Sequence, residues 1–203
     1  MIKFEKVSYT QFEKDMHECG FDATPKLMRE IYDNIKLPKR ATKGSAGYDF
    51  FAPMPLTFAN KVSKKFPTGI RCKMDDNVVL LLFPRSGLGF KHRFSIDNTI
   101  GVIDADYYNA KNEGHIHSKM HFDNITTTWL DINAGEAYMQ GVFVNYLKTD
   151  DDETDGVRVG GFGSTSKGWL KWIIEKNIKN ITELNFLKIM LFIILITTEM
   201  IMT

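Results

Sequence analysis

The pattern of apolar and polar residues changes character twice along the 203-residue chain. Residues 1–37 carry apolar side chains at helical spacing, after a short leading run that is typical of a strand. From Leu37 to Leu147, short apolar runs are interrupted by Gly, Pro, Asn and Asp, which is typical of strands and turns. Helical spacing returns in residues 169–196. The chain is therefore predicted to have a β-rich centre between two helical segments.

The first segment contains the signals for two helix starts. Ser8 and Gln11 make a capping-box pattern, in which the Ser side chain bonds a first-turn amide and the Gln side chain reaches back. Thr24 followed by Pro25 is typical of an N-cap and a first helical position. We interpret residues 1–37 as an N-terminal helical extension.

The central segment is predicted to be all-β. Val78–Phe83 is a continuous apolar run suited to a buried strand, and Ala137–Leu147 is a second strand candidate. Many short strands without helices between them favour a barrel or a jelly roll. We therefore expect residues 38–150 to form a jelly-roll-like or distorted β-barrel core.

The C-terminal part divides into an arm and a tail. Residues 150–156 are acidic and rich in turn formers, which indicates an exposed linker, and the Gly-rich run after them cannot hold a stable element alone. Residues 151–168 are interpreted as a flexible C-terminal arm that orders on a ligand. Residues 169–203 are predicted to be an amphipathic and hydrophobic helical tail of unknown role.

Composition and the tail bear on where the protein works. Lys188 and Glu199 bracket only ten uncharged residues, whereas a spanning helix needs about 20, so no membrane span is expected. A helix lying on a membrane surface is the alternative to packing against the protein. The net charge of +1 gives no general affinity for nucleic acid. Two cysteines without a signal peptide favour a cytoplasmic location.

Five short segments have a chemistry suited to one nucleoside triphosphate. They read Ala-Gly-Tyr-Asp-Phe from Ala46, Pro-Arg-Ser-Gly-Leu from Pro84, Gly-Val-Ile-Asp-Ala-Asp-Tyr from Gly101, Gly-Glu-Ala-Tyr-Met-Gln from Gly135 and Gly-Gly-Phe-Gly-Ser-Thr from Gly160. One such motif recurs by chance, but five in order are specific. Over residues 38–168 the chain resembles the trimeric dUTP diphosphatase (dUTPase) family. The resemblance implies a homotrimer with each site between subunits and the arm donated by a neighbour.

Asp104 is the candidate for the group that activates the attacking water. It follows the apolar pair Val102–Ile103, so a strand would hold its carboxylate rigidly. The resemblance places the family's water-activating aspartate on Asp104, in a reaction that converts dUTP to dUMP and diphosphate. The alternative is that Asp104 caps a turn, which is a common role for Asp.

Arg85, Ser86 and Gly87 have the groups that bind phosphate: a guanidinium fork, a hydroxyl and accessible backbone amides. The resemblance lays these three residues along the phosphate chain and places the glutamine of the fourth motif on Gln140. In that motif Glu136 stands where Asp is usual. The alternatives are a solvated turn for the first three residues and an ordinary strand position for Gln140.

Asn98 and Tyr107 flank the third motif as two sides of a β-hairpin would. The resemblance gives this hairpin the uracil, read by backbone groups with help from Asn98. It also implies that Tyr107 stacks on the deoxyribose and blocks a ribose 2′-hydroxyl, and that a tight hairpin excludes the 5-methyl of dTTP. Asn98 as an ordinary turn residue is the alternative.

The arm supplies the remaining predicted contacts. Phe162 resembles the aromatic residue that stacks on uracil, and it has no apolar neighbours with which to form a core. Gly163, Ser164 and Thr165 complete the motif, in which the two hydroxyl residues resemble γ-phosphate contacts. Arg158 is the expected charged partner of the γ-phosphate, although many relatives place this arginine one residue earlier.

Asp49 matches the aspartate that in the family lies near the water shell of the metal. Mg²⁺ keeps several waters and binds chiefly through substrate phosphates, so it needs no cage of protein ligands. The resemblance therefore implies Mg²⁺ held by dUTP and, through water, by Asp49.

His115, His117 and His121 share parity, so on one strand they would face the same side and could bind a transition metal. No cysteine or fourth ligand is apparent beside them, and we expect no metal site. The segment that contains them, residues 108–134, looks longer than in compact relatives and is the candidate contact surface for a regulatory protein partner.

Two other functions fit part of the pattern. A dCTP deaminase would share the expected fold and would release ammonia from dCTP. A phage-type regulatory dUTPase would act by binding a repressor protein, and its binding would survive Asp104→Asn. The third and fifth motifs favour dUTP hydrolysis, which limits uracil incorporation into DNA and supplies dUMP for dTMP synthesis.

Overall fold

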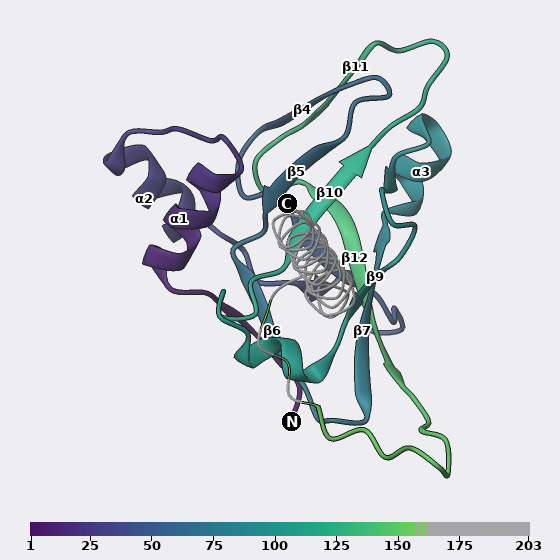
Figure 1. The fold of residues 1–203 in the computed structure, drawn as a ribbon. Coiled ribbons are helices and arrows are strands. Elements are labelled where there is room, and N and C mark those ends of the chain that lie inside the picture. The colour runs from purple at the N-terminus through teal and green to yellow at the C-terminus, as the bar shows by residue number, and fades with distance from the viewer. Residues whose placement is uncertain (157, 159, 161–203) are drawn as a thin grey trace, which may run out of the picture. The chain divides into compact units, whose positions relative to one another are not determined.

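The computed structural model describes residues 1–156, 158 and 160. Over this part of the chain it consists of short antiparallel strands with three α-helices and one 3₁₀ helix (Figure 1). The strands form four hydrogen-bonded sheets within the described residues, and the pairings do not close into one barrel. The prediction of an all-β, jelly-roll-like core is confirmed, without a closed barrel.

The largest sheet has five strands in the order β2-β3-β12-β7-β9. Its strands are β2 (Lys39–Arg40), β3 (Tyr48–Phe51), β7 (Val78–Pro84), β9 (Gly101–Ile103) and β12 (Ala137–Asn145). Strand β7 is not buried on both faces, because its side chains alternate between buried and half-buried positions. One face of this sheet therefore packs on the core and the other does not.

Three smaller sheets complete the β structure. They contain β5 (Lys64–Pro67), β10 (His117–His121) and β8 (Ser95–Ile96); β4 (Leu56–Ala59) and β11 (Trp129–Ile132); and β1 (Lys3–Lys6) with β6 (Ile70–Lys73). Aromatic rings fill the space between them. Phe58 packs edge-on against Phe94, and Phe66 packs against the fully buried Tyr138. These contacts fix the sheets that carry the candidate site.

The N-terminal extension is part of this core. Helices α1 (Tyr9–Glu18) and α2 (Pro25–Asp33) lie together on one side of the strands, away from the short helix α3 (Ser86–His92) (Figure 1). Both predicted caps are confirmed, since Ser8 and Thr24 accept bonds from first-turn amides. The Gln11 side chain does not complete the capping box, because it donates to Asp15 instead.

Residues 150–156 are exposed, as expected for an acidic linker. The predicted arm contacts Phe162, Gly163, Ser164 and Thr165 lie outside the described residues, and so does the tail 169–203. Among the described residues, no helix has the length and apolar character needed to cross a membrane.

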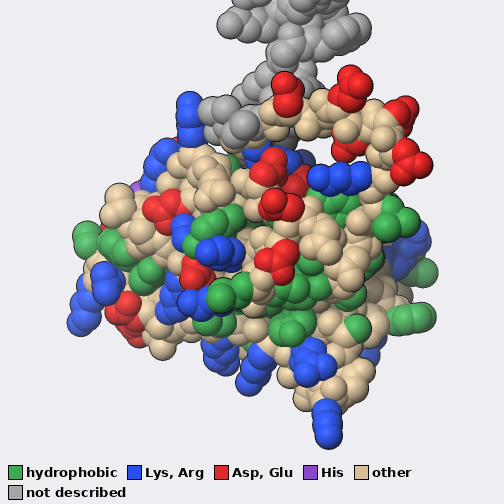
Figure 2. Space-filling view, turned by 90° about the horizontal axis from the view of Figure 1, so that it is seen from below, with side chains coloured by type: hydrophobic (Ala, Val, Ile, Leu, Met, Phe, Trp, Pro, Cys, Tyr) green, Lys and Arg blue, Asp and Glu red, His purple; other side chains and the backbone are tan. Residues whose placement is uncertain are grey.

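Hydrophobic side chains also reach the surface. Figure 2 shows them across the middle of the face seen from below, with acidic side chains along one edge. Phe90, Ile125 and Leu147 are each more than nine-tenths exposed.

Candidate active site

The predicted site residues that the structure describes form two groups. Asp49, Arg85–Gly87 and Gln140 lie where β7 ends, and we call them the Arg85 group. Asp104, Tyr107 and Arg158 lie where β9 ends, and we call them the Asp104 group. Asn98 belongs to neither group.

Strand register brings the residues of the Arg85 group together. Gln140 on β12 lies opposite Asp49 on β3, and on its other side β12 pairs with the last residues of β7. The Nε atom of Arg85 lies 3.4 Å from Oδ1 of Asp49. The side chain of Asp49 is 16% exposed and that of Arg85 44% exposed. A partly desolvated carboxylate therefore holds a guanidinium that still faces solvent.

A glycine in the first motif makes room for the glutamine of the fourth. A Cβ atom at Gly47 would lie 2.5 Å from Oε1 of Gln140, so a side chain there would push the Gln140 amide out of its present position. The amide nitrogen of Gln140 lies 3.5 Å from the carbonyl oxygen of Pro84. Gly47 thus allows Gln140 to approach the end of β7 beside Arg85.

A polar hollow adjoins this end of the sheet. It has a volume of about 490 Å³, and its lining includes Arg85, Ser86, Gly87, Lys91 and His92. Ser86 and Gly87 form the exposed first turn of α3, where backbone amides lack helical partners. The Nδ1 atom of His92 is buried without a hydrogen-bond partner among the described residues. From the sequence alone, residues 91–93 are interpreted as solvated surface, whereas the structure places Lys91 and His92 in the lining of this hollow.

Asp104 stands between a strand and a helical turn. It follows β9 and occupies the N-cap position of the 3₁₀ helix η1 (Ala105–Asn109), yet its side chain makes no capping hydrogen bond. Its carboxylate instead pairs with the Arg158 guanidinium, whose Nε also donates to Asp106 at 2.7 Å. The alternative of a simple turn cap therefore does not describe this side chain. Sequence reasoning missed Asp106 as well.

Tyr107 is buried beneath this ion pair. Its hydroxyl donates to the carbonyl oxygen of His115 at 2.8 Å, and burial raises its pKa to about 12. The guanidinium carbon of Arg158 lies 5.7 Å from the centre of the Tyr107 ring, within the range of a cation–π contact. The ring thus supports Arg158 on one side and is anchored through its hydroxyl on the other.

The prediction of a β-hairpin around the third motif was wrong, because the two strands that flank residues 97–100 do not pair with each other. Strand β8 pairs with β10, whereas β9 pairs with β7, so the segment between them passes from one sheet to another. Asn98 lies in this exposed crossing, next to Thr99 with its positive φ of 68°. Tyr107 lies in η1 rather than on a strand. The hairpin pattern failed because each strand finds a better-placed partner elsewhere in the fold.

The two groups lie far apart along β7. Ile103 is opposite Leu80, so Asp104 follows at the level of Val79, whereas Arg85 lies beyond the other end of the strand. Six residues of extended chain span about 20 Å. A single triphosphate chain is shorter than this, so one copy of the chain does not bring both groups to the same phosphate.

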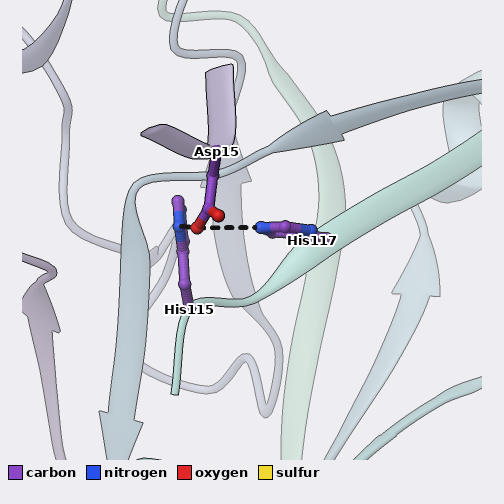
Figure 3. Close-up of side chains that lie close together, drawn as sticks. All are labelled: Asp15, His115 and His117. Atoms are coloured by element: carbon purple, nitrogen blue, oxygen red, sulfur yellow. Dashed lines mark hydrogen bonds and ion pairs between the residues drawn. The ribbon is translucent and has the colours of Figure 1, made fainter. Parts of the chain in front are cut away.

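The three histidines do not form one site. Nδ1 of His121 lies 2.8 Å from Asp97, whereas His115 and His117 converge on Asp15 from helix α1 (Figure 3). The expectation that no further ligand accompanies them was wrong, because Asp15 is distant in sequence. The tautomer of His115 nevertheless opposes a metal. The amide of Gly69 donates to its Nε2 at 2.8 Å, so Nδ1 carries the proton that points at Asp15.

Comparison with known proteins identifies the family. The dUTPase family model matches residues 33–166. The chain belongs to the dUTPase family. The deoxyuridine 5′-triphosphate nucleotidohydrolase of Lactococcus lactis is 41% identical over 149 residues, which cover 72% of this chain and 96% of the relative. That of Hahella chejuensis is 35% identical over 153 residues, covering 68% and 92%.

Solved dUTPase structures have a similar fold. The dUTPase of Streptococcus mutans superposes with a TM-score of 0.54 at 33% identity, covering 72% of this chain and 98% of the other. The dUTPase of phage phi11 of S. aureus has a TM-score of 0.52 at 18% identity, covering 78% and 98%, and this likeness concerns the fold alone. In the present dUTPase the β1 strand and both N-terminal helices begin before the family match.

Proposed function

We propose that this dUTPase hydrolyses dUTP to dUMP and diphosphate by in-line attack of water. The observation that carries the proposal is Asp104, which a paired strand delivers and whose half-exposed carboxylate is not used as a cap. The activity named for the relatives, deoxyuridine 5′-triphosphate nucleotidohydrolase, supports the choice of substrate.

The products define the bond that breaks. The water oxygen forms a bond to the α-phosphorus while the bond from that phosphorus to the α,β-bridging oxygen breaks, and diphosphate leaves with the bonding electrons. Asp104 accepts the proton that the water loses. A half-exposed carboxylate that directly follows a paired strand is suited to this role as a general base.

The residues of the Arg85 group would neutralise and orient the leaving diphosphate. The guanidinium of Arg85, the hydroxyl of Ser86 and the amides at Gly87 are donors of the kind that phosphate oxygens accept, and Gln140 adds a side-chain amide. Arg85 is 44% exposed beside Asp49, so it can turn to a phosphate without crossing a buried barrier. Arg158, with the arm residues Phe162, Gly163, Ser164 and Thr165, would close on the γ-phosphate and the uracil.

Mg²⁺ fits the carboxylate and phosphate oxygens that this arrangement supplies. Asp49 would hold it through water, which leaves the contact between Asp49 and Arg85 intact. When bound, Mg²⁺ would offset the negative charge of the phosphates. Asn98 and Tyr107 would select uracil and deoxyribose.

A homotrimer with each site between subunits would account for the separation of the two groups. About 20 Å of strand lies between Asp104 and Arg85 in one copy. The Arg85 group of one copy would therefore work with the Asp104 group of another. The outer face of the largest sheet supports this arrangement. It carries an apolar patch formed by Val79, Leu81, Val102, Val142 and Val144. A second copy would cover this patch.

The direct test is to incubate purified protein with dUTP, dCTP, dTTP or UTP and to measure the diphosphate that is released. Selective release of diphosphate from dUTP, lost when Mg²⁺ is removed with a chelator, is the expected result. Ammonia released from dCTP would instead indicate the deaminase. Equal hydrolysis of all four nucleotides would contradict the selectivity assigned to Asn98 and Tyr107.

A regulatory role is the second candidate. A dUTPase of Staphylococcus bacteriophage 80α is described as controlling transfer of virulence genes by a G protein-like mechanism. Segment 108–134 contains β10 and β11, and it exposes two large apolar side chains, Ile125 at 98% and Trp129 at 59%. A protein partner would bind there, and its binding would be lost in Ile125→Asp and kept in Asp104→Asn. The free thiols of Cys19 and Cys72 are consistent with a cytoplasmic protein.

A further inference from the structure

The segment that follows Asp104 is bound to the N-terminal extension at three places. The hydroxyl of Tyr108 donates to Glu5 at 2.7 Å. The backbone amide and hydroxyl of Ser8 both donate to Glu113, at 2.8 and 2.6 Å. The third contact, between Asp15 and His115, is the innermost. Residues from before the family match thus hold the chain just after the proposed catalytic aspartate.

The innermost contact is buried and directional. Asp15 is 3% exposed and His115 is fully buried, and Nδ1 of His115 lies 2.5 Å from Oδ2 of Asp15 (Figure 3). The same carboxylate oxygen accepts from Gln11 at 2.9 Å, and Nε2 of His117 lies 3.3 Å away. With the Gly69 amide on its Nε2, the imidazole of His115 has both nitrogens engaged, so its orientation is fixed.

A chain of hydrogen bonds connects His115 with the candidate site. The backbone carbonyl of His115 accepts from the hydroxyl of Tyr107 at 2.8 Å. The backbone amide of Tyr107 in turn donates to the carbonyl of Asp104 at 3.2 Å. Asn112 reinforces the middle of the chain, because its amide donates to both the Tyr107 hydroxyl and the His115 carbonyl. A shift of His115 would therefore be felt at η1.

We propose that Asp15, acting through His115, is a positioning residue for Tyr107 and for the turn that carries Asp104. The inference rests on the proposed dUTP hydrolysis for its effect on turnover, but its structural part does not. Fixing the buried Tyr107 from behind sets where its ring stands relative to the sugar of a bound nucleotide. The discrimination between deoxyribose and ribose would then depend on a residue that never contacts the substrate.

A metal centre is the rival interpretation of the same three side chains, since their ligand atoms lie within 4.8 Å of one another. Metal binding at Nδ1 of His115 would require loss of the proton there while Nε2 still accepts from Gly69. A neutral imidazole cannot offer both nitrogens as acceptors. The hydrogen bonds therefore favour a positioning role.

The experiment compares Asp15→Ala and Asp15→Asn with Asp22→Ala in the full-length protein. Asp22 makes the matched control, because it also contacts a histidine, His17 at 3.0 Å, but on the exposed surface of the extension. The kcat and KM for dUTP and UTP are measured below the melting temperature of each variant. Hydrogen exchange of the η1 amides is measured in parallel, and it reports on the turn whether or not the protein has activity.

Asp15→Ala is expected to lower the ratio of kcat/KM for dUTP over UTP by about tenfold, because small displacements of positioned groups are costly. Exchange at η1 should become faster. Asp15→Asn keeps an acceptor for His115 and should fall between wild type and Asp15→Ala, so it remains informative if the alanine variant does not fold. Asp22→Ala should match wild type in both measurements.

Three results would overturn the inference. The first is a folded Asp15 variant with unchanged selectivity and unchanged η1 exchange. The second is an Asp15 variant whose melting temperature falls while its selectivity and its η1 exchange stay at the wild-type values. The third is stabilisation of wild type, but not of the Asp15 variants, by Zn²⁺, which would make the cluster a metal site. A wild-type protein that does not hydrolyse dUTP would contradict the proposed function, and hydrogen exchange would still decide the positioning of η1.

Discussion

At the scale of single residues, the charge balance around Asp104 is the central feature. The side chains of Asp104 and Asp106 are 50% and 54% exposed, whereas that of Arg158, which joins them, is only 16% exposed. One cation thus serves two carboxylates, and a bound phosphate would compete for it. Binding of the nucleotide would draw Arg158 from Asp104 and leave the carboxylate available to the attacking water.

Asp104→Asn should reduce turnover of dUTP by at least about a hundredfold, the usual scale for a positioned general base. The amide cannot accept the proton, but it fills the same space, so the fold and nucleotide binding should persist. Steady-state kinetics and equilibrium binding of a non-hydrolysable dUTP analogue measure the two effects separately. Near-normal turnover in this variant would remove Asp104 from the mechanism, and Asp22→Asn is the control for a change of one surface charge.

The buried pair of Asp15 and His115 should make the protein sensitive to acid. Burial alone raises the pKa of Asp15, but hydrogen bonds from His115 and Gln11, together with the nearby His117 ring, outweigh it and hold that pKa well below the usual range. Burial lowers the pKa of His115, against the opposing effect of Asp15. Protonation of either residue is therefore easier in the unfolded chain, and stability is lost as the pH falls.

The expected pH dependence has two parts. Wild-type stability should begin to fall below about pH 6.5, where an unfolded histidine takes up its proton, and should fall further below about pH 4 as Asp15 protonates. Asp15→Asn lacks the second loss. Urea midpoints at pH 7, 5 and 3.5 should therefore show a gap between wild type and Asp15→Asn that narrows at the lowest pH. A gap of constant width would show that Asp15 is not held ionised.

At the scale of elements, the sequence predicted what short-range patterns determine. Ser8 and Thr24 cap helices as expected, and Asp104 follows a strand. The encounter of Asp15 with His115 was not predictable, because the two residues are 100 positions apart and meet only when α1 packs on the sheets. The partners of β8 and β9 were missed for the same reason, since a local pattern does not say which strand lies alongside.

The arm is the element whose contribution is simplest to separate from the fold. Ending the chain before Gly160, or replacing Phe162 by Ala, should lower kcat/KM for dUTP by about tenfold or more if the arm closes over bound nucleotide. Melting temperature should change little, because an arm that is ordered only by ligand adds little to the stability of the free protein. Kinetics and calorimetry on the same samples test both statements. Full activity after truncation would exclude the arm from the site.

At the scale of the whole molecule, the outer face of the largest sheet and the separated groups lead to one expectation. Val102 and Val144 are 51% and 40% exposed on this face, next to half-buried neighbours. Burying such a patch against another copy would gain roughly 25 cal/mol for each Å² of apolar surface. In an assembly built through this face, we expect Arg85 of one copy to work with Asp104 of the next.

Mixing two inactive variants tests this arrangement. Asp104→Asn and Arg85→Ala should each be inactive alone, but equal co-expression should restore about a quarter of wild-type activity, because one site in four of a random cyclic trimer joins two intact groups. Light scattering should give a mass near three times 23.3 kDa. Activity that stays at the level of the separate variants would show that each copy builds its own site.

The packing of the first thirty-two residues determines which part of the chain can fold as a unit. A chain shortened to residues 33–166, the extent of the family match, would lose β1, the strand with which β6 pairs in the described part of the chain. It would also lose Phe12, Met16 and Met28 from the interior. The match to the family model therefore outlines a smaller unit than the one that folds. The segment before the match is therefore expected to be needed for folding, and its removal should give an insoluble product rather than a minimal enzyme.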